Sequence, residues 1–170
     1  MIDERDHIGR LDFRTMGTGA RVRDAADAAG RLGENAGFLA SRFAYIASRA
    51  ADDVLARFDL TTRPYSVLEL AAAAEAPSQR EIGRVLLLDP SHVLRLVDRL
   101  ADRGLVERVR GGDDRRITRI RATAEGRRVV DEAAAELGAA YEGLLADMPR
   151  TDRDELLRLL RTAAFASVLE

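Results

Sequence analysis

The spacing of the apolar residues changes at Gly104, and this change limits the folds that the chain can adopt. Before Gly104, apolar residues recur every three or four positions, which is the period of a helix with one buried face. After it, the runs LVERV and ITRIRAT flank a Gly-Gly pair, and the second run alternates apolar and polar residues. Period two with one apolar face is typical of a half-buried strand. Helical spacing then returns for two long segments. The pattern predicts a mainly α fold with one small β-hairpin.

Four helices are expected before the hairpin, and three of them have recognisable start signals. Pro64 suits the first turn of the second helix. Ser78, with Glu81 three residues later, predicts a capping box for the third. Asp89 and Pro90 suit the N-cap and first turn of the fourth. The apolar stripes of the third and fourth helices are Ile82, Val85, Leu86, Val93, Leu96, Val97 and Leu100. In the last helix of the chain, Thr151 is expected to be the cap.

Composition excludes several classes of protein. The 170 residues are 46% hydrophobic and 33% charged, which suits one globular domain with an added dimerisation layer. The absence of cysteine excludes disulfides, thiolate zinc sites and a cysteine redox sensor. No apolar run approaches the ~18 residues of a membrane span, and the charged start MIDERDHIGRLDF lacks the core of a secretion signal. We therefore expect a cytoplasmic protein that does not enter a membrane.

Positive charge gathers around the Gly-Gly pair. The segment from Arg108 to Arg121 holds six arginines and two acids and so carries +4, while the whole chain carries −2. A helix fits the major groove of B-DNA, and a thin hairpin can lie along the backbone or in the minor groove. Charge placed on such a hairpin would approach phosphates, while the acidic remainder of the chain would oppose indiscriminate binding.

On these residues the chain resembles the MarR (multiple-antibiotic-resistance regulator) family of winged helix-turn-helix transcription factors. The matching pieces are SQREIGRVLLLDPSHVLRLVDRLADRGLVERV, then DDRR, then RATAEGRR, where the family usually has an LTxxG pattern. The resemblance implies a winged helix-turn-helix domain over residues 60–123, whose hairpin is the wing. It also implies dimerisation helices in residues 34–59 and 124–170. The leader, residues 1–33, is expected to add a helix to the dimer core.

The resemblance also assigns residues to DNA. The family carries an Asp-x-Arg unit at the wing tip, where the Asp braces an Arg that enters the minor groove. Asp114 and Arg116 occupy those places, and Arg115 beside them suits a phosphate contact. The narrow minor groove has a concentrated negative potential that attracts a planar guanidinium. The alternative is an ordinary solvated pair of surface charges.

On the fourth helix, five residues lie on or near the face outside the apolar stripe: Pro90, Ser91, His92, Leu94 and Arg95. Arg95 matches a family position that contacts a base or a phosphate, and Arg can bind guanine bidentately. Leu94 departs from the small polar residue that is common there, and either contacts a thymine methyl or reads nothing. The alternatives are pairing of Arg95 with Asp98 or Asp102, and a capping role for His92.

Many family members release DNA when a small aromatic or phenolic molecule binds between the dimerisation and DNA-binding regions. The candidates for such contacts in this chain are Tyr45, Arg49, Arg63 and Tyr65. Packing would use the same residues, so both interpretations stay open at this point.

We therefore expect a sequence-specific DNA-binding regulator that acts as a homodimer on a pseudo-palindromic operator. Family tendency favours a repressor over an activator. The alternative is a helical interaction dimer of the same fold that reads no DNA. An enzyme is not expected, because the chain has two histidines and no cysteine, HExxH, phosphate loop or GxGxxG. Ser91 and His92 are neighbours along a helix and do not point at one substrate atom. No cofactor or metal site is expected.

Overall fold

The computed structural model describes residues 25, 27–110 and 118–166. The chain divides into two compact units, residues 1–45 and residues 46–170. Helix α2 (Ala36–Leu55) begins in the first unit and continues into the second. No helix in the described part of the chain is long and apolar enough to cross a membrane.

In the first unit, a short helical segment precedes α2. Residues 27–29 are helical, and the 3-10 turn η2 (Gly30–Glu34) follows them. Asn35 then caps α2, because its side-chain oxygen accepts a hydrogen bond of 2.9 Å from the amide of Phe38. Residues 1–24 and 26 of the leader lie outside the described residues, so the helix predicted to pack on the dimer core stays a prediction.

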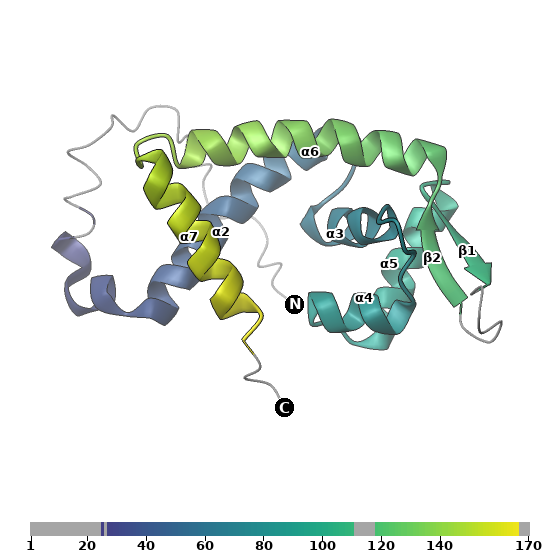
Figure 1. The fold of residues 1–170 in the computed structure, drawn as a ribbon, viewed down its shortest axis with the longest axis horizontal. Helices are drawn as coiled ribbons and strands as arrows, with labels where there is room; N and C mark the ends of the chain where they lie inside the picture. The colour runs from purple at the N-terminus through teal and green to yellow at the C-terminus, as the bar shows by residue number, and fades with distance from the viewer. Residues whose placement is uncertain (1–24, 26, 111–117, 167–170) are drawn as a thin grey trace, which may run out of the picture. The chain divides into compact units, whose positions relative to one another are not determined.

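The second unit confirms a mainly α fold with one β-hairpin (Figure 1). After α2 come η3 (Ala56–Phe58), α3 (Thr62–Ala71), α4 (Gln79–Leu86), α5 (Pro90–Asp102), β1 (Val106–Arg110), β2 (Thr118–Ala122), α6 (Ala124–Leu144) and α7 (Arg150–Ala164). Helix α5 packs against α3, α4 and β1, while α3 also packs against α6 and β2. The predicted order of helix, helix, tight turn, helix and hairpin is therefore confirmed.

Local signals place the starts of α4 and α5 where the sequence predicts them. Ser78 and Glu81 form a reciprocal capping box at α4. The Asp89 carboxylate accepts a 2.9 Å hydrogen bond from the amide of His92 and caps α5. The prediction that Thr151 caps the last helix is wrong, because α7 begins at Arg150 after Pro149.

The core of the second unit lies between α3, α5, α6 and the hairpin. Its largest fully buried side chains are Leu55, Val67, Leu68, Ile82, Val93, Val97, Leu100 and Ile120. The predicted apolar face of α5 is buried throughout. Val85 departs from the prediction, since 47% of its surface is exposed. Helix α4 has only two turns and buries Ile82, with Leu86 partly buried against the core, so Val85 faces away from it.

The two strands of the hairpin pair with each other, and β2 also pairs with the segment before α4. Strands β1 and β2 are antiparallel, with Val106 opposite Ala122 and Arg110 opposite Thr118. The amide of Ile120 also donates a 2.7 Å hydrogen bond to the carbonyl of Pro77. Backbone pairing therefore links the hairpin directly to the start of the helix-turn-helix.

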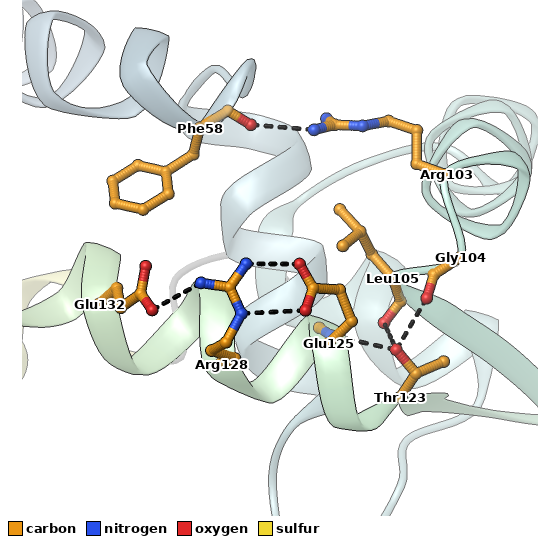
Figure 2. Close-up of polar contacts among 9 residues, drawn as sticks. Phe58, Arg103, Gly104, Leu105, Thr123, Glu125, Arg128 and Glu132 are labelled. Carbon is orange, nitrogen blue, oxygen red and sulfur yellow. Dashed lines mark hydrogen bonds and ion pairs between the residues drawn. The ribbon is translucent and has the colours of Figure 1, made fainter.

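The corner between β2 and α6 is built around Thr123 (Figure 2). The Thr123 hydroxyl donates a 2.7 Å hydrogen bond to the carbonyl of Gly104 and accepts one of 3.0 Å from the amide of Gly126. Gly126 allows a close approach at this corner: a Cβ atom there would lie 2.0 Å from the carbonyl oxygen of Leu105. This glycine corresponds to the last residue of the family's LTxxG pattern.

Candidate nucleic-acid interface

Helix α5 has one face in the core and one face in solvent. Val93, Leu96, Val97 and Leu100 are buried, whereas Pro90, Ser91, Leu94 and Arg95 are exposed and His92 is half-buried. The buried and exposed residues fall on opposite faces because the helix has a period of 3.6 residues. The exposed face thus presents a hydroxyl, an aliphatic side chain and a guanidinium close to the helix N-terminus, where backbone amides favour negative groups.

A chain of hydrogen bonds orders this exposed N-terminus. The Ser91 hydroxyl donates to the Asp89 carboxylate over 2.6 Å, and the Arg95 guanidinium lies 3.4 Å from the Ser91 oxygen. The hydrogen bond from Ser91, and then that from the amide of His92, hold the pKa of Asp89 below its usual range. Asp89 therefore stays ionised near neutral pH and keeps Ser91 in position beside Arg95.

Asp98 of α5 has another partner than Arg95. It forms an ion pair with Arg108 of β1, which joins α5 to the hairpin. Arg103 donates a hydrogen bond of 2.6 Å to the carbonyl of Asp59. It donates another of 2.9 Å to the carbonyl of Phe58 (Figure 2). Arg103 therefore fastens the end of α5 to the turn between α2 and α3.

Several arginines of the Arg108–Arg121 segment are engaged within the protein. Arg121 pairs with Glu107 across the hairpin. Arg119 donates a 2.8 Å hydrogen bond to the carbonyl of Ala76 and lies 3.8 Å from the Glu81 carboxylate. With Arg108, three of the four arginines that the structure describes in this segment contact other protein groups. Part of the positive charge of the segment is therefore used within the protein and is not free to bind DNA.

The wing-tip residues predicted to touch DNA, Asp114, Arg115 and Arg116, lie outside the described residues. The link between Arg119 and the helix-turn-helix was missed by sequence reasoning. Strand alternation places Arg119 on the face opposite Ile120, but only the fold brings Ala76 to that face.

A pocket of about 350 Å³ lies between the end of α2, α3 and α6. Its lining residues are Ala51, Leu55, Thr62, Tyr65, Ser66, Glu69, Ala134, Leu137, Gly138 and Tyr141. Of the predicted effector contacts, Tyr65 lines this pocket, whereas Arg49 and Arg63 are exposed and lie outside its lining. Tyr45 is exposed in the first unit.

Sequence reasoning missed Glu69 and Tyr141 in this pocket. Glu69 follows Tyr65 by four residues, so the two share one face of α3. Burial, and then the charge of Glu69, raise the pKa of Tyr65 to about 12. Burial also raises the pKa of Tyr141, with further contributions from Glu69 and Asp52. Both hydroxyls therefore stay protonated and face a negative potential.

Metal binding has no support in the described part of the chain. Within residues 25, 27–110 and 118–166, there is no group of three or more His, Asp or Glu side chains that could hold a metal ion.

Comparisons with known proteins agree with this architecture. A sequence model of the MarR family matches residues 58–117. An uncharacterised HTH-type transcriptional regulator of Bacillus subtilis, YhbI, is 29% identical over 106 residues, which cover 62% of this chain and 69% of YhbI.

Three solved structures are similar over most of their length. CouR from Rhodococcus jostii RHA1, bound to p-coumaroyl-CoA, is 38% identical with a TM-score of 0.74, over 82% of this chain and 98% of that one. A MarR family transcriptional regulator from Rhodococcus sp. RHA1 is 38% identical with a TM-score of 0.71, over 77% of this chain and 94% of that one. A structure of the repressor CouR on a 23-mer DNA duplex is 30% identical with a TM-score of 0.72, over 80% of this chain and 96% of that one.

Proposed function

Because the chain belongs to the MarR family of DNA-binding transcriptional regulators, we propose that it is a cytoplasmic homodimeric repressor. Its operator is pseudo-palindromic, with half-sites about one helical turn apart, so that each subunit presents one α5 and one hairpin to DNA. A small aromatic or phenolic effector releases it from the operator.

The exposed face of α5 carries this proposal. Arg95 contacts a guanine or a phosphate, and Ser91 and His92 read bases near the helix N-terminus. Pro90 lies against the DNA backbone, and Leu94 contacts a thymine methyl group. The DNA-bound structure of CouR supports this use of the fold.

The wing adds contacts of a second kind. Arg116 enters the minor groove, Asp114 braces it and Arg115 contacts a phosphate. The ion pair of Arg108 with Asp98 supports this assignment, because it joins the hairpin to α5 and so relates the two contact regions.

Release by an effector is supported by the pocket between α3 and α6. Its volume of about 350 Å³ suits an aromatic group, and the similar regulator CouR binds p-coumaroyl-CoA. Tyr65 is the predicted effector contact that lines the pocket, whereas Tyr45, Arg49 and Arg63 lie outside its lining.

Selection of bound sites from random DNA, followed by titration of variants at several salt concentrations, tests the proposal. Arg95→Ala should lose ~1–3 kcal/mol at one operator position and relax the base preference there. Arg116→Ala should weaken binding to most sequences and flatten the slope of log affinity against log salt by about one unit. Asp114→Ala should weaken binding less than Arg116→Ala, because the arginine survives without its brace.

Arg161→Ala on α7 is the control for loss of a positive charge, and it should leave the base preference intact. If no site is enriched from random DNA, the chain is instead a helical interaction dimer that reads no DNA. If a site is enriched but Arg116→Ala binds like the wild type at moderate salt, the wing assignment is wrong.

A further inference from the structure

We infer that the pocket between α3 and α6 selects its effector by charge. It accepts an aromatic group whose polar end donates a hydrogen bond and carries no negative charge, and it discriminates against aromatic carboxylates. The inference rests on the proposed role of this pocket as the effector site.

The pocket wall combines apolar surface with one acidic side chain. Ala51, Leu55, Ala134 and Leu137 supply apolar surface for an aromatic ring. The charged side chain in the lining is Glu69, and no arginine lines the pocket within the described part of the chain. An incoming carboxylate would therefore meet a like charge, and the lining would offer it no guanidinium in compensation.

Two hydroxyl side chains of the pocket lining, Thr62 and Ser66, already donate their protons to protein acceptors. Thr62 donates a hydrogen bond of 2.9 Å to the Asp52 carboxylate. Ser66 donates one of 2.9 Å to the carbonyl of Thr62. Tyr65 shares the pocket lining with Glu69, whose charge raises the pKa of the Tyr65 hydroxyl. The Thr62 and Ser66 hydroxyls are left with acceptor lone pairs, so this part of the pocket complements a donor such as a phenol, an amide or an amine.

The electrostatic potential in the pocket also disfavours an anion. The charges of Glu69 and Asp52 reach the Tyr141 hydroxyl and oppose its ionisation, and Glu69 does the same at Tyr65. The same field would act on an anion in the pocket. The Arg57 guanidinium pairs with Glu136 and does not line the pocket. Because Glu69 is exposed and partly screened, we expect discrimination of about tenfold.

Three ligands of matched size test this inference: cinnamate, cinnamide and cinnamylamine, titrated against the full chain by NMR at pH 7.5. The amide and the amine should bind about ten times more tightly than the acid. In Glu69→Gln, the acid should gain affinity and the ratio of acid to amide dissociation constants should fall to about threefold or less. Glu142→Gln, which removes the same charge beside Tyr141 from a position outside the lining, should keep the wild-type ratio.

The inference is overturned if the wild type binds acid and amide equally, if none of the three ligands binds, or if Glu69→Gln leaves the ratio unchanged. Operator binding without ligand is measured separately. Intact operator binding with no charge selectivity would refute this inference alone, whereas charge selectivity in a chain that binds no operator would refute the proposed function alone.

Discussion

At Gly126, the absence of a side chain sets how closely α6 approaches the end of α5. The helix begins directly after β2, and its first turn lies against the carbonyl of Leu105. A Cβ atom at position 126 would also lie 3.2 Å from the Leu68 side chain in the core. Since the opposing atom at 2.0 Å belongs to the backbone, a rotamer change cannot relieve the clash.

Gly126→Ala should therefore destabilise the protein by about 3 kcal/mol, because α6 or the Leu105 segment must move. Urea denaturation followed by circular dichroism measures this free energy of unfolding. Gly138→Ala in the same helix is the control: a Cβ atom there meets nothing within 4 Å, so the variant should gain up to ~1 kcal/mol from helix propensity. Equal stability of the two variants would contradict the close approach.

At the scale of elements, the hairpin and the helix-turn-helix are connected by polar contacts from both strands. Strand β1 reaches α5 through Arg108 and Asp98. Strand β2 reaches the segment before α4 through the backbone of Ile120 and through Arg119. Such links restrict the orientation of the hairpin relative to α5, which matters for a protein that must place both on one DNA duplex.

Arg119→Met should lower operator affinity by about three- to tenfold, because the hairpin loses its hydrogen bond to the Ala76 carbonyl. Arg121→Met is the matched control. It removes the same charge from the same strand, but its partner, Glu107, belongs to the hairpin itself. Fluorescence anisotropy with labelled operator measures the operator affinity of both variants. A similar loss in the two variants would show that charge alone matters at these positions.

At the scale of the whole molecule, α7 carries apolar surface that a single chain does not bury. Leu157 is 68% exposed, Leu160 37% and Phe165 72%. Contiguous exposed apolar residues on one helix are typical of an interface. They support the proposed homodimer, in which α7 packs against the partner subunit.

Sedimentation at micromolar concentration should give about twice the chain mass of 18.7 kDa. Leu160→Glu should weaken both the dimer and operator binding, because a buried unpaired carboxylate costs several kcal/mol. Leu160→Met, which conserves the side-chain volume, should leave both the dimer and operator binding intact. A wild-type monomer that binds a palindrome cooperatively would contradict the proposed dimer.

Features that depend on near neighbours in the chain can be predicted from the amino-acid sequence. The capping box of Ser78 and Glu81 and the cap at Asp89 were predictable, because a cap and its partners lie within three residues. The buried face of α5 and the position of the hairpin follow from hydrophobic period alone. The resemblance of residues 60–128 to a known family added the assignment to DNA.

The tertiary structure alone decided which distant residues meet. Arg119 and the Ala76 carbonyl are 43 positions apart, and Arg103 is 45 positions from Phe58. No local period encodes such pairs. The exposure of Val85 likewise depends on how α4 docks, and the pocket of Tyr65, Glu69 and Tyr141 exists only where α6 crosses α3. Helix starts follow from local hydrogen bonds, whereas the charge of a pocket follows from packing between helices far apart in the chain.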